Sequence, residues 1–203
     1  MRMNCAPEQK NENKLGVADL LHEAARLCAK EEYSQAFRIY QQLANSGHSE
    51  SQVFLGWMFA EGKGVCACQE DAAHWFRRAA ELGSARGAFY LGRLLTSEAK
   101  HADAILWYQR SAAAGYPPSQ FRLGVSYLRG KGVRKDLSLA FRYLETAKAN
   151  GNIFARRELA LLDIRGYRGS MRRLQGVFEL SFSIILGIGF ALAAPYSDDL
   201  TGC

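Results

Sequence analysis

Small and large apolar positions recur along the chain at helical spacing. Alanines stand at equivalent places in successive segments: Ala36, Ala72, Ala104 and Ala140. A bulky apolar pair follows each alanine three and four residues later: Ile39–Tyr40, Trp75–Phe76, Trp107–Tyr108 and Tyr143–Leu144. Positions three and four apart lie on one face of an α-helix. The pattern therefore predicts helices in which a small residue lets a neighbouring helix approach closely while a bulky one packs beside it.

Glycines divide these helices into repeated units. Successive segments close at intervals of 36, 32 and 36 residues, at Gly47, Gly83, Gly115 and Gly151. The pairs Leu55–Gly56, Leu91–Gly92 and Leu123–Gly124 keep the same register. A period in the mid-thirties is the length of one helix-turn-helix unit. Because one such unit cannot bury its apolar face alone, the copies are expected to stack into a solenoid.

Three segments carry a resemblance to a known repeat family. They are Phe54–Val65 (FLGWMFAEGKGV), Ala72–Gly83 (AAHWFRRAAELG) and Leu123–Asp136 (LGVSYLRGKGVRKD). They resemble the Sel-one-like repeats, a variant of the tetratricopeptide solenoid, and the resemblance covers roughly residues 33–165. It implies an all-α fold, a right-handed α/α superhelical solenoid of about four to five helix-turn-helix repeats, which typically binds other proteins.

The repeats and their flanks predict the domain organisation. A flexible tail is expected over 1–14, the helical repeat domain over 15–170, a hydrophobic helix over 171–194 and a short tail over 195–203. The repeat units are expected at 15–48, 49–84, 85–116, 117–152 and, in part, 153–170. In the third unit, residues 96–101 replace the glycine-rich loop, which accounts for the shorter interval.

The stretch 177–194 contains a single charge, Glu179, and is close to the length of a membrane span. Four arginines around its start are expected to contact lipid headgroups: Arg165, Arg168, Arg172 and Arg173. Asp198–Asp199 follow the stretch on its other side. Because basic flanks stay on the cytoplasmic side, this asymmetry predicts a single C-terminal anchor that holds the repeats at the cytoplasmic face of a membrane.

The same stretch also fits a hydrophobic closing helix that lies against the last repeat. Gly176 follows Ala140 by 36 residues and Gly187 follows Gly151 by 36, so the stretch keeps the register of a second helix. Recovery of the full-length chain in the soluble fraction without detergent would contradict the membrane-anchor hypothesis. The N-terminal residues contain no apolar run of a secretory signal, so secretion is not expected.

The charge distribution bears on the class of partner, and the cysteine spacing bears on the cellular compartment. The net charge is +6 and the sequence pI is about 9.1. Basic residues are spread over several units and the aromatic residues keep the core register, so nucleic acid is not expected as a partner. The five cysteines are widely scattered, which favours reduced thiols in the cytoplasm over a disulfide framework.

Cys66 and Cys68, followed by His74, are the candidate residues for metal binding or nucleophilic catalysis. Structural zinc needs four ligands, and no second pair completes the set, so no metal is expected. Cys68 also stands where Asp136 can cap a helix start in the later unit. No catalytic triad, phosphate loop or dinucleotide fingerprint occurs, so no catalytic residue, cofactor or small-molecule substrate is expected.

These observations favour a non-catalytic adaptor whose repeat groove binds another protein or peptide. The resembled family includes accessory proteins of envelope and exopolysaccharide systems, and such a role is the finer expectation. First-helix positions outside the core register are predicted to line the groove: Gln52, Arg86, Tyr90, Arg93, Gln120 and Arg122. Two alternatives stay open: a soluble cytosolic scaffold with a hydrophobic capping helix, and a repeat-type hydrolase that uses Cys66 and Cys68.

Overall fold

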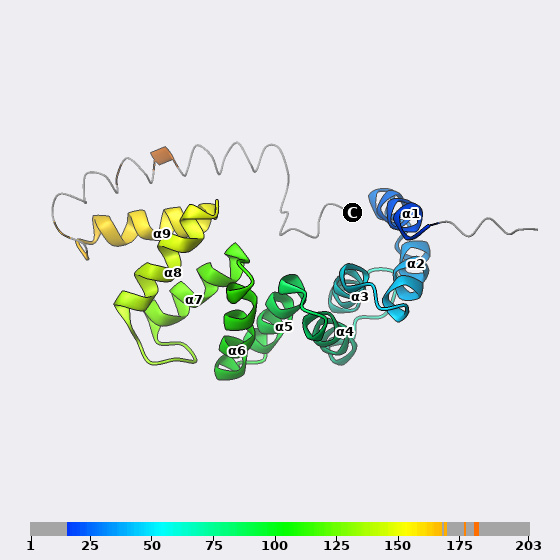
Figure 1. The fold of residues 1–203 in the computed structure, drawn as a ribbon, viewed down its shortest axis with the longest axis horizontal. Helices are drawn as coiled ribbons and strands as arrows, with labels where there is room; N and C mark the ends of the chain where they lie inside the picture. The colour runs from blue at the N-terminus through cyan, green and yellow to red at the C-terminus, as the bar shows by residue number, and fades with distance from the viewer. Residues whose placement is uncertain (1–15, 168, 170–176, 178–180, 183–203) are drawn as a thin grey trace, which may run out of the picture.

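The computed structural model describes residues 16–167, 169, 177 and 181–182. Within these residues the chain forms nine α-helices and no strand, and Figure 1 shows them in order along the chain. Their bounds are α1 Val17–Ala29, α2 Tyr33–Asn45, α3 Ser49–Glu61, α4 Gln69–Glu81, α5 Ala85–Ser97, α6 His101–Ala113, α7 Pro117–Arg129, α8 Leu137–Ala149 and α9 Ile153–Ile164.

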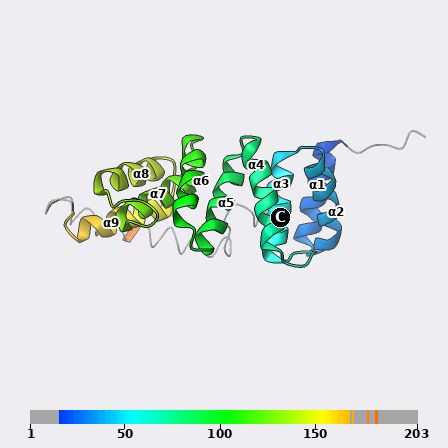
Figure 2. The ribbon, with the colours of Figure 1, turned by 90° about the horizontal axis from the view of Figure 1, so that it is seen from below.

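The helices stack as antiparallel pairs, each against the next. Helices that follow one another in the chain pack together from α1 to α9, and Figure 2 shows most of them standing side by side in a row. The row curves, with α3, α5 and α7 toward its inner side and α4 and α6 on its outer side (Figure 1). The predicted all-α solenoid is confirmed: α1–α8 form four pairs and α9 begins a fifth.

The small-and-large pattern packs as the sequence predicts. Ala36, Ala72, Ala104 and Ala140 are all 0–1% exposed. A Cβ added at Gly56 would lie 2.7 Å from the Phe76 ring, and one at Gly92 would lie 2.7 Å from the Tyr108 ring. Helix backbones therefore approach until a ring rests on a glycine. This close approach gives the stack its regular spacing, because interiors pack nearly without voids.

The connection between the two helices of a unit alternates along the array between a tight turn and a longer loop. The loops after α3 and α7 each contain a Gly-Lys-Gly sequence, in which Gly64 has φ 72° and Gly132 has φ 73°. A Cβ at Gly64 would overlap the Tyr33 carbonyl, and one at Gly132 would overlap the His101 carbonyl. Each loop therefore lies directly on the first residue of the second helix of the preceding unit. The first and third units have tight turns instead.

The tight turn of the third unit places a strained residue at Ala99. Its φ is 61°, in the left-handed region that costs an L-residue about 1–2 kcal/mol. We expect Ala99→Gly to raise the free energy of unfolding by about 1 kcal/mol in urea denaturation. Ala102→Gly, at an exposed position in α6, is the matched control and should lower it by up to about 1 kcal/mol. A loss of stability in Ala99→Gly would contradict the strain at this turn.

Most of the predicted C-terminal helix lies outside the described residues, as do Arg168, Arg172, Arg173 and the terminal tails. No helix in the described part of the chain is long and apolar enough to cross a membrane. Within the stretch, the Phe182 ring lies 5.4 Å from the guanidinium of Arg156 on α9. The closing helix and the membrane anchor both stay predictions.

Candidate partner-binding surface

The inner side of the curve is formed by one stripe of residues from each of three helices. Residues spaced by four, three and four positions lie on one face of a helix. The stripes are Glu50, Phe54, Trp57 and Glu61 on α3, Arg86, Tyr90, Arg93 and Ser97 on α5, and Pro118, Arg122, Val125 and Arg129 on α7. We call these twelve residues the inner surface. It carries aromatic and arginine side chains in its middle and glutamates toward α1.

Arg86 and Arg93 are held against aromatic rings on this surface. The Arg86 guanidinium lies 5.6 Å from the Phe54 ring and forms an ion pair with Glu50 at 2.7 Å. The Arg93 guanidinium lies 5.5 Å from the Tyr90 ring. Stacking on a ring fixes a guanidinium and leaves its N–H donors directed outward along its edge. Both side chains are half-buried and remain accessible in part.

Tyr90 belongs to the core more than to the surface. It is 5% exposed, and its ring stacks on Phe76 at 5.4 Å. Its role in the predicted groove is therefore to support Arg93 from below. Arg122, in contrast, is exposed on α7 as the sequence predicts.

The structure places Gln52 and Gln120 in the interior, so they are not available to a partner. Gln52 is 0% exposed and its Nε2 donates to the carbonyl of Ala44 at 3.1 Å. Gln120 is 5% exposed and accepts a hydrogen bond from Asn150 Nδ2 at 2.9 Å. Each glutamine precedes a Leu-Gly pair by three and four residues and so shares its buried face. These side chains form hydrogen bonds between neighbouring elements of the array. Their polar character alone therefore does not place them on the binding surface.

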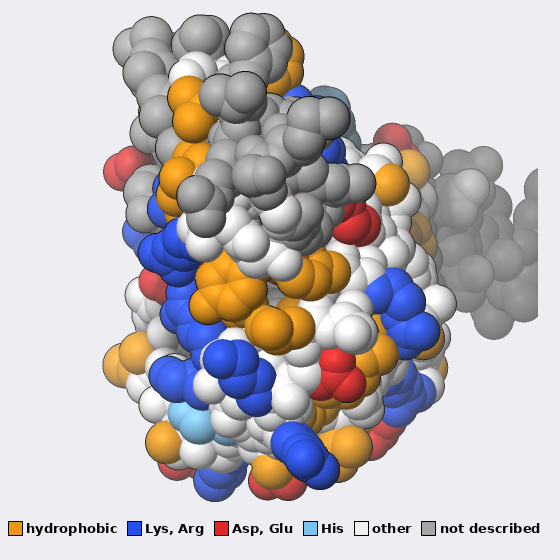
Figure 3. Space-filling model, turned by 90° about the vertical axis from the view of Figure 1, so that its left-hand side faces the viewer, with side chains coloured by type: hydrophobic (Ala, Val, Ile, Leu, Met, Phe, Trp, Pro, Cys, Tyr) orange, Lys and Arg blue, Asp and Glu red, His pale blue; other side chains and the backbone are white. Residues whose placement is uncertain are grey.

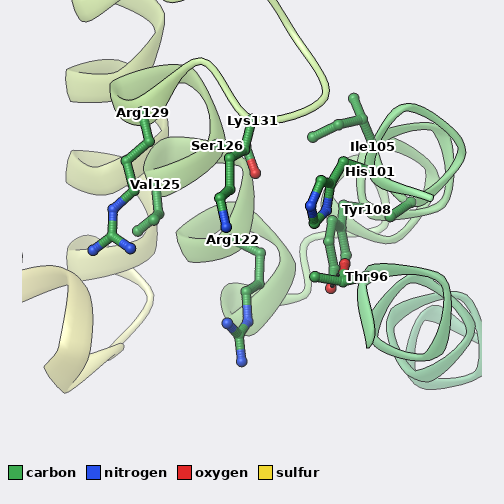
Figure 4. A pocket seen from close by; sticks show the side chains of 10 residues that line it. Thr96, His101, Ile105, Tyr108, Arg122, Val125, Ser126, Arg129 and Lys131 are labelled. Carbon is green, nitrogen blue, oxygen red and sulfur yellow. Dashed lines mark hydrogen bonds between the residues drawn. The ribbon is translucent and has the colours of Figure 1, made fainter. Parts of the chain in front are cut away.

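A pocket of about 130 Å³ opens between α6 and α7. Its polar lining comes from Thr96, His101, Tyr108, Arg122, Ser126, Arg129 and Lys131. In Figure 4, Arg122 and Lys131 lie on the α7 side, opposite His101, Tyr108 and Thr96. We call this hollow the α6–α7 pocket. No aspartate or glutamate is among its lining residues.

The three cations of the pocket have no acidic partner in the described part of the chain. No ion pair joins Arg122, Arg129 or Lys131 to a carboxylate there. The loop glycine at 132 explains how Lys131 reaches the pocket, because it allows the loop to lie on the start of α6. Of these residues the sequence predicted only Arg122. Arg129, Lys131 and His101 come from separate elements, and the recurring Gly-Lys-Gly loop was the signal that could have located Lys131.

Two hydroxyl groups form the floor of the pocket. Thr96 Oγ1 donates to the Gly92 carbonyl at 2.8 Å, so it accepts the hydrogen bond that joins it to the Tyr108 hydroxyl at 3.1 Å. Burial raises the pKa of Tyr108, and the Thr96 hydrogen bond and the charges of Arg122 and Arg93 offset part of that rise. The phenol therefore stays protonated near neutral pH, and its oxygen can still accept a hydrogen bond.

The cysteine loop shows no feature of a nucleophile. Cys66 is exposed, and no side chain caps α4, whose N-cap is Cys68. The Asp71 backbone N–H lowers the pKa of the Cys68 thiol, but the carboxylates of Asp71 and Glu70 and burial outweigh it, so the pKa is raised overall. A raised pKa reduces the reactive thiolate. No group of three His, Cys, Asp or Glu that could hold a metal occurs among the described residues.

The α8–α9 end of the array is a second accessible region. Phe154 is 55% exposed and its ring lies 6.0 Å from Phe121. Seen from this end, hydrophobic side chains gather beside scattered Lys and Arg side chains (Figure 3). The inner surface is the candidate site, because it combines arginine and aromatic side chains.

Comparison with known proteins places this architecture in a family. The Sel1 repeat model matches residues 13–48, 49–84, 86–116 and 117–152, which correspond to the helix pairs α1–α2, α3–α4, α5–α6 and α7–α8. The chain is a Sel1 repeat protein. Sel1 repeats form non-catalytic scaffolds that bind other proteins, and the resemblance seen in the sequence is confirmed.

Two relatives of this Sel1 repeat protein are regulators by name. Chitin synthase regulator SKT5 of Saccharomyces cerevisiae is 28% identical over 141 residues, which cover 66% of this chain and 20% of that protein. An exopolysaccharide production negative regulator of Rhizobium leguminosarum is 25% identical over 136 residues, covering 58% of this chain and 51% of that one. The chain thus spans from a fifth to a half of the length of these relatives.

A solved structure shares the fold of this Sel1 repeat protein along nearly its whole length. The crystal structure of a Sel1 repeat protein from Oxalobacter formigenes matches with a TM-score of 0.73 at 23% identity. The match covers 96% of this chain and 87% of that one. This likeness establishes the fold of the array.

Proposed function

We propose that this Sel1 repeat protein is a non-catalytic adaptor whose inner surface binds an extended segment of a partner protein. The observation that carries the proposal is the pair of arginines stacked on aromatic rings in the middle of that surface, Arg86 over Phe54 and Arg93 over Tyr90. Arginine and aromatic side chains dominate the binding energy of protein interfaces. A curved helical array presents them along one continuous concave face.

The inner surface suits recognition by shape and charge. Arg86 and Arg93 on α5 and Arg122 and Arg129 on α7 place four guanidinium groups on this surface. Such a surface attracts acidic segments and accelerates their association. Binding needs no catalytic group, which agrees with a scaffold family and with the raised pKa of the Cys68 thiol.

The finer role we propose is that of an accessory subunit of an envelope or exopolysaccharide system. The names of the yeast and rhizobial relatives, both regulators of polysaccharide production, support this choice. Attachment to the cytoplasmic face of a membrane through 177–194, with Arg165 and the three arginines after it at the headgroups, is part of this proposal. It is separate from the binding activity of the inner surface.

Affinity capture with a charge-reversed inner surface tests the adaptor. The full-length chain is used as bait in detergent-solubilised lysate, and the captured proteins are quantified by mass spectrometry. We expect Arg93→Glu to reduce the capture of the specific partner by about tenfold or more, because the new carboxylate repels an acidic segment. Arg77→Glu, at an exposed position on α4 on the outer side, is the matched control and should leave capture unchanged.

Circular dichroism of both variants confirms that the array is folded before capture is compared. Equal capture by wild type and Arg93→Glu, or a loss confined to Arg77→Glu, would contradict an inner binding surface. The absence of any protein above an unrelated bait would contradict the adaptor itself.

A further inference from the structure

The interface between α6 and α7 departs from the pattern that closes the two equivalent interfaces before it. Phe54 on α3 stacks on Tyr40 with ring centroids 4.9 Å apart, and Tyr90 on α5 stacks on Phe76 at 5.4 Å. The equivalent sixth residue of α7 is Arg122. Where the earlier interfaces hold an aromatic ring, this one holds a cation beside a cavity of about 130 Å³.

The chemistry of the α6–α7 pocket selects a carboxylate. Arg122, Arg129 and Lys131 supply positive charge without a described acidic partner, and no aspartate or glutamate lines the pocket. Charge-assisted hydrogen bonds from arginine to a carboxylate are shorter and stronger than neutral ones. The volume is that of about four water molecules, enough for a carboxylate with its methylene groups.

The surroundings restrict the length of the anion. Glu50 and Glu61 lie on the inner stripe of α3, and Glu158 on α9 occupies the helix position equivalent to that of Arg122. A polyphosphate backbone running along the array would meet these carboxylates on either side of the cations. A protein segment with one or two acidic side chains needs only the short cationic region on α5 and α7.

We propose that the α6–α7 pocket binds the carboxylate of an aspartate or glutamate side chain in an acidic segment of the partner protein. This inference rests on the proposed function and deepens it, because it assigns a place and a chemistry to one anchor of the partner. Arg122 is the main ligand, and Lys131 on the Gly-Lys-Gly loop closes the pocket from the side.

Peptide binding to the full-length chain tests the pocket. The probe is a fluorescein-labelled peptide of alternating glutamate and leucine, and its matched control has glutamine in place of every glutamate. Fluorescence anisotropy gives Kd for each. We expect the glutamate peptide to bind at least about tenfold more tightly than the glutamine peptide, and its Kd to rise with added salt.

Arg122→Phe is the decisive variant, because the chain already places Phe54 at the equivalent position in a packed interface. We expect it to fold with unchanged helix content and to weaken the glutamate peptide by about tenfold or more. Arg77→Phe on the outer side of α4 removes the same charge and should leave Kd unchanged. Arg122→Lys should retain part of the affinity.

The remaining outcomes decide against the pocket. Equal Kd values for the two peptides, or for wild type and Arg122→Phe, would overturn the proposal. Stronger Arg122-dependent binding to a single-stranded oligonucleotide or to phosphatidylserine vesicles would replace it with nucleic acid or lipid. If Arg93→Glu loses the captured partner while Arg122→Phe keeps it, the adaptor stands and only the pocket assignment fails.

Discussion

Leu91→Ala is expected to lower the free energy of unfolding by about 3 kcal/mol. Leu91 on α5 is 0% exposed and lies in the largest hydrophobic cluster, which also contains Phe76 and Tyr108. Removing its side chain leaves a cavity that close-packed neighbours fill only in part. Because each repeat contacts only its neighbours, a defect in the third unit weakens both halves of the array. Urea denaturation followed by circular dichroism measures the change.

Leu106→Ala provides the matched control for this result. Leu106 lies on the next helix, α6, and is 65% exposed. The same substitution there should change the free energy of unfolding by no more than about 0.5 kcal/mol. Similar losses at the two leucines would contradict a core in which the Leu-Gly positions carry the packing between units.

Gly87→Leu is expected to destabilise the chain by about 3 kcal/mol or more, through overpacking. A Cβ at Gly87 would lie 2.7 Å from Ala79 Cβ, 2.9 Å from the Ala80 backbone nitrogen and 3.0 Å from the Phe76 carbonyl oxygen. Backbone atoms cannot rotate away as a side chain can. The helices α4 and α5 must therefore separate, which opens the boundary between the second and third units.

Ala102→Leu is the control, because it adds a larger side chain at an exposed position of α6. Its free energy of unfolding should match that of wild type within about 0.5 kcal/mol. Thermal unfolding measured on the full-length chain compares the two variants. A wild-type melting temperature for Gly87→Leu would show that the α4–α5 boundary is looser than the close approach of these helices requires.

The repeat fold can be predicted from the sequence because the residues that determine it are close together in the chain and recur in each unit. Each copy of the alanine-aromatic pattern repeats the same packing. The spacing from Ala72 to Phe76 equals that from Ala104 to Tyr108, and this equal spacing gives the register of the repeats without knowledge of any contact. The resemblance to the Sel-one-like repeats rests on Phe54–Val65, Ala72–Gly83 and Leu123–Asp136. A predicted helix cap also holds: Asp136 accepts a hydrogen bond from the Leu139 backbone N–H at 2.9 Å.

The candidate site can be predicted from the sequence only in part, because it depends on how separate elements pack together. Arg86, Arg93 and Arg122 lie outside the core register in the sequence, and in the structure they are partly exposed or exposed. Gln52 and Gln120 have the same polar character but are buried, because polarity alone does not reveal a hydrogen bond to a neighbouring element. The α6–α7 pocket needs three helices, α5, α6 and α7, and the loop after α7 to be placed together.

One substitution in the register explains why the pocket exists at all. The sixth residue of the first helix is Phe54 and Tyr90 in two units and Arg122 in the next. In a sequence this reads as one more charged residue on an amphipathic helix. Only the stacked rings of the earlier interfaces show that the arginine takes the place of a packed aromatic side chain.

Site-specific photo-crosslinking tests the central claim, that the inner surface is where the partner binds. A photoreactive benzoylphenylalanine replaces exposed Ser97 on the inner stripe of α5 or, in a separate variant, exposed Arg77 on the outer side of α4. The account predicts a crosslink to the captured partner from position 97 and none from position 77. A crosslink from position 77 alone would contradict it and assign binding to the outer side of the array.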